Sequence, residues 1–132
     1  MALVLDTRFL LTYLFPPISE DRDLLIRFAR TRLRHDALVI PAIVVTEFLK
    51  IAGRKIGISN AEAWIRCFIE SSARIEAVME KDCFEAGRIL CRHHNVPIAD
   101  ALIAAIAKRL RAIVITDDPH FKEIGVKTLW YR

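Results

Sequence analysis

Hydrophobic positions along this chain fall into two kinds of segment that alternate. Short continuous apolar runs occur at residues 2–5 and 37–40, and strands are also expected at 111–115, which is apolar after Arg111, and at 126–130. A weaker alternating pattern covers 74–79. Runs of this length are typical of strands buried on both faces. Longer stretches with apolar residues at helical spacing lie between them, at residues 8–14, 19–34, 42–52, 81–94 and 98–110, with a further helix opening at 59.

Local residues suggest where several of these helices begin and end. Ser19 and Ser59 are candidate N-caps, and Glu62 three residues after Ser59 completes a capping-box pattern. Gly53 is a candidate stop for the segment 42–52, since glycine commonly follows the last residue of a helix. Pro97 is expected to open the Ala-rich helix over 98–110.

Strands that alternate with helices predict βαβ units, and hence a parallel sheet covered on both faces. The chain has 132 residues and shows no repeat, linker or low-complexity tract. We therefore expect one α/β domain over residues 1–132, long enough to bury a substantial core.

Composition narrows the class of protein further. The hydrophobic share of 54% excludes disorder, and no apolar stretch reaches the roughly 18 residues that a membrane span needs. The first residues carry Asp6 inside an apolar run, unlike a secretory signal. Three cysteines without CxxC spacing indicate reduced thiols in a cytoplasm. The net charge of +4 is compatible with a phosphate-bearing partner and equally with a basic protein that binds none.

Acidic side chains follow two of the predicted strands. Asp6 comes after the run 2–5, and Thr116, Asp117 and Asp118 come after the run 111–115. In open α/β sheets, ligands bind beyond the carboxyl ends of the strands, so these side chains are candidate functional groups. The alternative is turn chemistry, because aspartate favours turns and helix N-caps.

Two further acids lie on predicted helices. Glu47 has Ile43, Val44 and Ile51 as same-face neighbours, so it lies at the margin of a buried face and needs a cation or a proton. An ion pair with Lys50 would also account for it. Asp100 stands in the first turn of the helix after Pro97, where the helix dipole alone would explain an acid.

Four short motifs occur in order along the chain: V-L-D-T at Asp6, P-A-I-V-V-T-E at Glu47, A-D-A-L-I-A-A at Asp100, and I-T-D-D-P-H-F at Asp118. This series resembles the PIN-domain nucleases, and among them the VapC-type toxins of prokaryotic toxin–antitoxin pairs. The match extends from Asp6 to Phe121. Each motif alone is weak, whereas the ordered set in a chain of this length is specific.

The resemblance implies a three-layer α/β/α sandwich with a central parallel sheet. It also implies that Asp6, Glu47, Asp100 and Asp118 gather into one Mg²⁺ or Mn²⁺ site that hydrolyses RNA. Clustered carboxylates repel one another, and a hard divalent cation relieves this repulsion. No Ser or Cys nucleophile with a His partner is evident in the sequence, so an activated water is the simpler hypothesis.

The last motif of the family, T-x-D-x-x-F, assigns supporting roles. Thr116 and Phe121 occupy fixed positions, and Thr116 is expected to support the site through its hydroxyl. Asp117 occupies the variable position and is treated as auxiliary. Arg8 departs from the family, which usually has a small polar residue there; it could bind substrate phosphate, pair with Asp6, or point to solvent.

The resemblance further implies a homodimer, inhibited by a small antitoxin protein. Two related functions stay open on the sequence alone: a housekeeping RNA-processing enzyme, and a PIN-like module that binds RNA or protein without cutting. A phospho-acceptor receiver domain is disfavoured, because its acidic pair should follow the first strand rather than a late one.

Overall fold

A computed structural model describes residues 1–34 and 36–132. The described part of the chain contains a five-stranded parallel sheet with the strand order β3-β2-β1-β4-β5. The strands are β1 (Ala2–Leu5), β2 (Ala37–Pro41), β3 (Ala73–Glu76), β4 (Ile113–Ile115) and β5 (Thr128–Leu129). The expected parallel sheet is confirmed.

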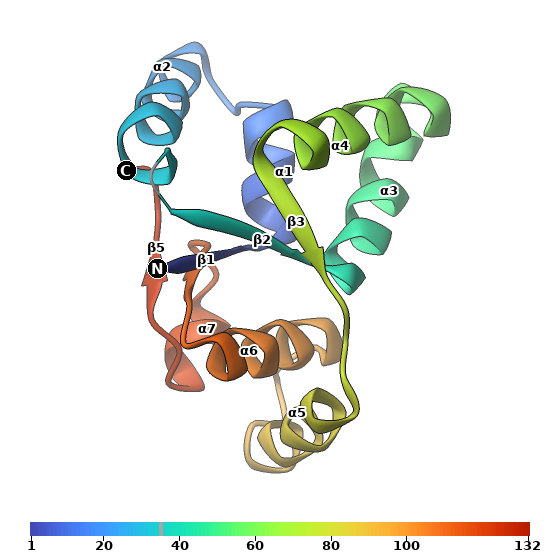
Figure 1. The fold of residues 1–132 in the computed structure, drawn as a ribbon, viewed down its shortest axis with the longest axis vertical. Coiled ribbons are helices and arrows are strands. Elements are labelled where there is room, and N and C mark those ends of the chain that lie inside the picture. Colours follow the sequence, from blue (N-terminus) through green and yellow to red (C-terminus); the bar gives the residue numbers. More distant parts are fainter. Residues whose placement is uncertain (35) are drawn as a thin grey trace.

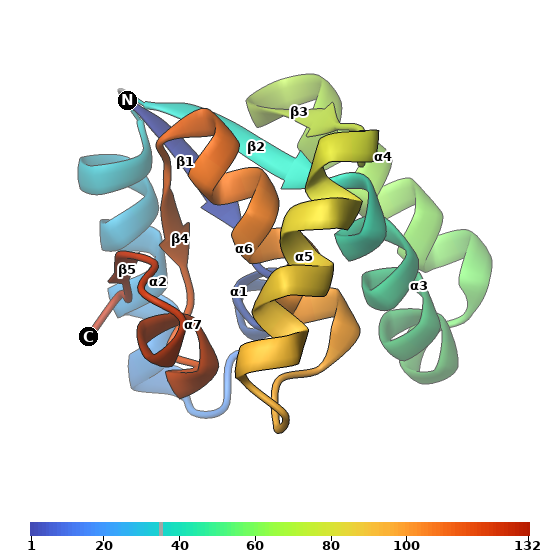
Figure 2. The same ribbon diagram turned by 90° about the horizontal axis from the view of Figure 1, so that it is seen from below.

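Helices cover both faces of this sheet (Figure 1). On one side lie α1 (Thr7–Leu14), α2 (Ser19–Phe28) with its π-helical extension η1 (Ala29–Leu33), α3 (Ala42–Ile56) and α4 (Ile58–Ser72). On the other side lie α5 (Glu80–Arg92), α6 (Ile98–Leu110) and the short α7 (Pro119–Glu123), as the view from below shows (Figure 2). The arrangement is the expected three-layer α/β/α sandwich.

The residues of the central strands β1, β2 and β4 form the middle of the hydrophobic core. Val4, Val39 and Val114, which pair across β2, β1 and β4, are each 0% exposed. Because helices cover both faces, every position of these strands is apolar rather than every second one. None of the helices in the described residues combines the length and hydrophobicity needed to cross a bilayer.

Two helix boundaries differ from those predicted. Helix α3 continues through Gly53 to Ile56 and ends at Gly57, whose φ of +87° is the conformation that favours glycine. Gly53 instead lies against α4, where a Cβ would come 3.4 Å from the Ile58 side chain. Helix α4 therefore begins at Ile58, and the predicted Ser59 cap is wrong because Ser59 already lies within the helix.

The other predicted segments are confirmed in kind, with shifts at their ends. Helix α2 begins at Ser19, so Ile18 is the residue at the cap position and no side-chain cap forms. Strand β4 starts at Ile113 rather than at residue 111. The single turn α7 was not predicted, because five residues are too few to show helical periodicity.

Candidate functional site

The register of β1 and β4 brings Asp6 and Thr116 together. Leu5 pairs with Ile115, so the residues that follow each strand leave the sheet side by side. The Thr116 hydroxyl donates to Asp6 Oδ2 at 2.8 Å, and the Thr7 amide donates to Asp6 Oδ1 at 2.8 Å. Asp6 is only 3% exposed. The expected supporting position of Thr116 thus corresponds to a direct hydrogen bond.

Asp6 and Asp118 also cap helices, as the turn interpretation predicted. Asp6 is the N-cap of α1, and Asp118 is the N-cap of α7, where its Oδ1 accepts the His120 amide at 3.0 Å. The Asp118 amide in turn donates to the Thr116 hydroxyl at 3.1 Å. Each carboxylate oxygen has a second lone pair, so capping leaves both acids able to bind a further group.

Glu47 reaches the same edge of the sheet from the second turn of α3. Its Oε1 accepts the Thr7 hydroxyl at 2.7 Å, so the residue after Asp6 ties α3 to the end of β1. Among the described residues Lys50 forms no ion pair with Glu47 within 4 Å, and Lys50 is exposed. The ion-pair explanation of Glu47 is therefore wrong.

Asp100 meets the site from the first turn of α6, with its side chain 14% exposed. Its Oδ2 lies 3.2 Å from Nδ1 of His120. The same nitrogen lies 3.1 Å from Asp118 Oδ1. One imidazole nitrogen therefore lies between a carboxylate of α6 and the carboxylate that caps α7.

The electrostatics of this edge disfavour full ionisation of the acids. Burial raises the pKa of Asp6 to about 7; the charges of Asp100 and Glu47 raise it as well, and the hydrogen bonds from Thr116 and Thr7 only partly offset them. The pKa of Asp100 is also raised, first by burial and then by Asp118. No Lys or Arg nitrogen among the described residues lies within 4 Å of either carboxylate. The site is thus short of positive charge.

A divalent cation fits this donor set. Oxygen atoms of Asp100 and Asp118 and a ring nitrogen of His120 all lie within 4.8 Å of one another. Asp6 joins them through Thr116, and Glu47 through Thr7. The structure therefore brings all four sequence-predicted acids to one edge of the sheet.

His120 was not singled out from the sequence, although it lies within the last motif. Its place two residues after Asp118 offered one clue, because a side chain at that position of a new helix can turn back towards the cap residue. The contact with Asp100 could not be read from the sequence, since it depends on how α6 and α7 pack.

Arg8 lies at the rim of the site rather than within it. Its Nε donates to Asp117 Oδ1 at 2.6 Å, and the two side chains are 56% and 38% exposed. Of the three alternatives for Arg8, the pair with Asp6 does not form. Asp117, the auxiliary acid, is thus paired with an arginine. None of the other four acids has an Arg or Lys partner among the described residues.

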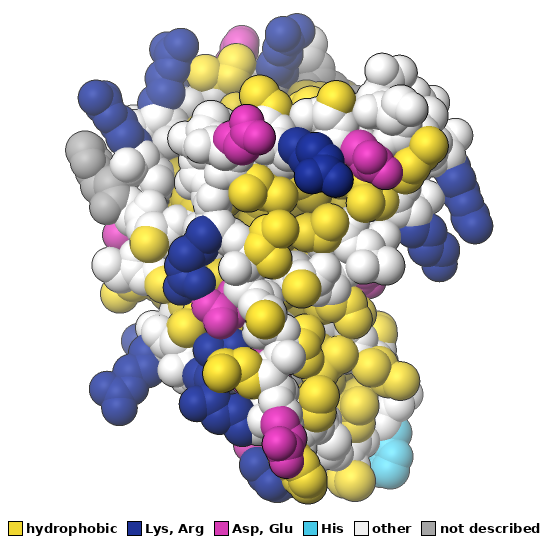
Figure 3. Space-filling model, turned by 45° about the vertical axis from the view of Figure 1, so that its right-hand side comes forward, with side chains coloured by type: hydrophobic (Ala, Val, Ile, Leu, Met, Phe, Trp, Pro, Cys, Tyr) yellow, Lys and Arg dark blue, Asp and Glu magenta, His cyan; other side chains and the backbone are white. Residues whose placement is uncertain are grey.

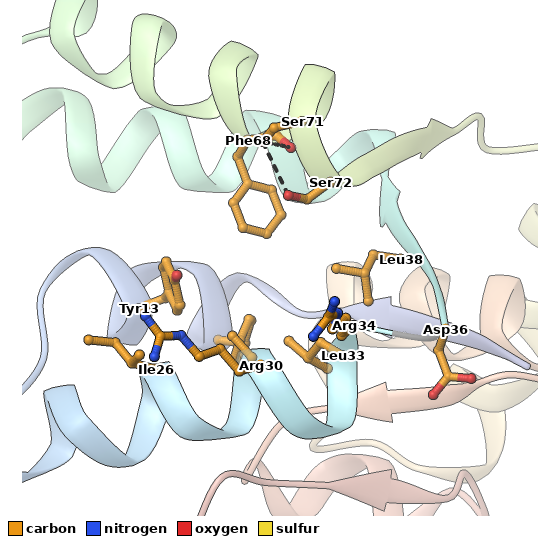
Figure 4. A pocket seen from close by; sticks show the side chains of 12 residues that line it. Tyr13, Ile26, Arg30, Leu33, Arg34, Asp36, Leu38, Phe68, Ser71 and Ser72 are labelled. Atoms are coloured by element: carbon orange, nitrogen blue, oxygen red, sulfur yellow. Dashed lines mark hydrogen bonds between the residues drawn. The ribbon is translucent and has the colours of Figure 1, made fainter.

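A separate groove of about 760 Å³ lies between η1 and α4 (Figure 4). Phe68 from α4 points into it, opposite Arg30 and Leu33 on the other wall. None of the four acids lines this groove. It is therefore a surface distinct from the acidic edge.

Comparison with solved structures places the fold among known ones. The chain is similar to VapBC-1 of nontypeable Haemophilus influenzae, with a TM-score of 0.78, 19% identity, and coverage of 99% of this chain and 98% of that one. VapC20 of Mycobacterium tuberculosis, described as a toxin that cleaves the sarcin–ricin loop, matches with a TM-score of 0.78, 17% identity, and coverage of 94% and 95%. FitAcB of Neisseria gonorrhoeae matches with a TM-score of 0.71, 22% identity, and 96% coverage of each chain. At these identities the likeness concerns the fold.

Among curated proteins, no sequence matches the chain. Family assignment therefore depends on the pattern of motifs across the whole chain rather than on a near relative. The model of the PIN domain matches residues 3–127, which include all four motifs and every strand but the last. By this match, and in agreement with the resemblance in its motifs, the chain belongs to the PIN domain family.

Proposed function

We propose that the protein is a metal-dependent ribonuclease that hydrolyses RNA phosphodiester bonds. The observation that carries the proposal is the cluster of acids at the carboxyl edge of the sheet, buried or half-buried with no Lys or Arg partner among the described residues. An acid cluster of this kind is unfavourable by itself, and a Mg²⁺ or Mn²⁺ ion would relieve it. The pKa values of Asp6 and Asp100 are raised first by burial and then by the neighbouring carboxylates.

Asp100 and Asp118 are the acids best placed to hold the ion directly, with Asp6 and Glu47 completing its surroundings. When bound, the ion would offset the charge between the acids and an anionic phosphodiester and make a water molecule a better nucleophile. Thr116 and Thr7 donate hydrogen bonds that keep Asp6 ionisable and fix its direction. The Thr7 hydroxyl also donates a hydrogen bond to Glu47 and so fixes the direction of that carboxylate.

RNA is the proposed substrate. Arg8, half-exposed beside the acids, can exchange its Asp117 partner for a substrate phosphate, a contact that positions a nucleic acid without reading its sequence. The net charge of +4 favours a polyanion in general. VapC20, a protein of the same fold, is described as cleaving the sarcin–ricin loop.

We further propose that the protein is the toxin of a toxin–antitoxin pair and works in the cytoplasm. Relatives in fold were solved as VapBC-1 and as a toxin–antitoxin complex from Klebsiella pneumoniae. The three cysteines are free, in keeping with a reducing compartment. Expression in a bacterial host should arrest growth, and co-expression of a small protein encoded beside it should restore growth. Unimpaired growth without that protein would contradict the toxin assignment.

A homodimer is proposed as the active assembly. Large apolar side chains are exposed on and beside α5, with Phe84 62% and Met79 45% exposed, and hydrophobic surface gathers there (Figure 3). Patches of this kind mark interaction surfaces. Sedimentation velocity should give a dimer for the wild type and a monomer for Phe84→Arg; a wild-type monomer would exclude the dimer.

Cleavage of a structured RNA with Mn²⁺ tests the main proposal. Asp6→Asn and Asp118→Asn should each lower the single-turnover rate by a factor on the order of 100 or more, as loss of a group that stabilises charge at a reacting centre does. Glu62→Gln, which changes an exposed acid of α4, is the matched control and should cleave like the wild type. Undiminished cleavage by both site variants would overturn the assignment.

A further inference from the structure

His120 differs from the four acids in the atom that it offers. Its Nδ1 lies 3.2 Å from Asp100 Oδ2 and 3.1 Å from Asp118 Oδ1. Two ligand atoms about 2.1 Å from one ion and at right angles to each other are separated by about 3.0 Å. Both observed separations are of hydrogen-bond length in the metal-free site, and they are also close to the spacing of neighbouring ligands of an octahedral ion.

The local backbone holds the ring in this place. Pro119 begins α7 with a restricted φ, and the His120 amide donates to the same Asp118 oxygen that faces the ring. The imidazole is 31% exposed, so solvent reaches it and its position does not depend on a tightly packed core. The side chain is therefore oriented towards the two acids by its own capping turn.

We propose that His120 is a nitrogen ligand of the divalent ion, together with Asp100 and Asp118, and that it makes the site select a first-row transition metal such as Mn²⁺ over Mg²⁺. This inference rests on the proposed metal site and deepens it. Mg²⁺ strongly prefers oxygen ligands, whereas imidazole binds the transition metals from Mn²⁺ towards Cu²⁺ with increasing strength. A purely carboxylate site lacks this source of discrimination.

Pulsed electron paramagnetic resonance of Mn²⁺ bound to the wild-type protein tests the ligand directly. Nitrogen modulation from a coordinated imidazole is expected, and this measurement does not depend on the folding of any variant. Calorimetric titrations with MnCl₂ and with MgCl₂ then measure selectivity in the wild type, His120→Gln and His94→Gln. His94 is an exposed histidine in the turn between α5 and α6 and is the matched control.

His120→Gln should raise the Kd for Mn²⁺ about 10- to 100-fold and remove the nitrogen modulation. It should change the Kd for Mg²⁺ less than about threefold, since glutamine still offers an oxygen. His94→Gln should change neither. Mn²⁺ binding without nitrogen modulation, and with unchanged selectivity in His120→Gln, would overturn this inference and leave the acidic metal site intact. Failure of the wild type to bind either metal would overturn the proposed function itself.

Discussion

Asp6 and Asp82 are both almost fully buried, at 3% and 1% exposure, yet their surroundings are opposite. Asp82 lies in the first turn of α5, where Arg109 of α6 donates to both of its oxygens at 2.9 and 3.0 Å. Burial raises the pKa of Asp82, but the hydrogen bonds from Arg109 and from the Met79 amide outweigh it, so the net shift is downward. Asp6 receives hydrogen bonds only from a hydroxyl and an amide, and its pKa rises to about 7.

The difference shows what each acid does. The Asp82 carboxylate is neutralised by the Arg109 guanidinium of the same chain. This pair joins α5 to α6, and no ion from solution is needed to balance its charge. A buried carboxylate left without one, beside Asp100 and Glu47, is stable only with a proton or with a cation from solution. Burial alone would not separate a structural acid from a functional one, but the presence of a basic partner does.

The largest expected effect is that of Asp6→Asn on the pH dependence of the free energy of unfolding. In metal-free protein, folded Asp6 keeps its proton up to a pKa of about 7, while the unfolded residue loses it near its ordinary pKa of 3.8. Between these values the unfolded state binds fewer protons, so Asp6 lowers the free energy of unfolding progressively as pH rises, and the loss levels off above pH 7. The shift corresponds to on the order of 4 kcal/mol at most.

The measurement is urea unfolding of wild type and Asp6→Asn in EDTA from pH 4 to pH 8. The variant should gain stability over the wild type as pH rises, because asparagine cannot ionise. A difference between the two proteins that stays constant over this range would show that Asp6 is not electrostatically unfavourable.

Arg109→Met tests whether buried Asp82 depends on its arginine partner. Loss of the guanidinium leaves Asp82 buried without a cation, which should lower the free energy of unfolding by about 3 kcal/mol at pH 7. Arg88→Met, which breaks the exposed Arg88–Glu85 pair on α5, is the control and should change it by less than about 1 kcal/mol. Equal effects of the two substitutions in urea unfolding would mean that Asp82 does not depend on its partner.

Arg8→Ala should have the smallest effect on stability. Its pair with Asp117 is exposed, so the free energy of unfolding should change by less than about 1 kcal/mol. If Arg8 binds substrate phosphate, RNA binding should weaken, and the slope of log affinity against log salt should fall by about 1. Filter binding at several salt concentrations measures this slope. An unchanged slope would confine Arg8 to its pair with Asp117.

Much of the fold could be predicted because its information is local. The continuous apolar runs of β1 and β2 and the helical spacing of α6 are visible in the sequence, and their bounds agree with those predicted to within a residue. Boundaries failed where a neighbouring element decided them. Gly53 did not end α3, because the positive-φ residue that follows the helix is Gly57, where α4 begins to fold back on α3.

Some acids of the candidate site could likewise be placed from the sequence, and others could not. Asp6 and Asp118 could be placed from the sequence, since parallel strands must end at the same edge of a sheet and each acid follows a strand. Glu47 had partial support from its apolar same-face neighbours, whereas Asp100 depended mainly on the family resemblance. Both lie on helices whose position over the sheet no local pattern specifies.

By itself the sequence determined the α/β class, the parallel sheet and the ordered set of acids, because hydrophobic periodicity and motif order are properties of the chain. Tertiary structure alone decided which groups touch: Thr7 with Glu47 across 40 positions, Arg8 with Asp117 across 109, and His120 with Asp100 across 20. Such contacts depend on strand register and on how helices pack against the sheet. They decide which acids have a cation within the chain and which are left to bind one from solution.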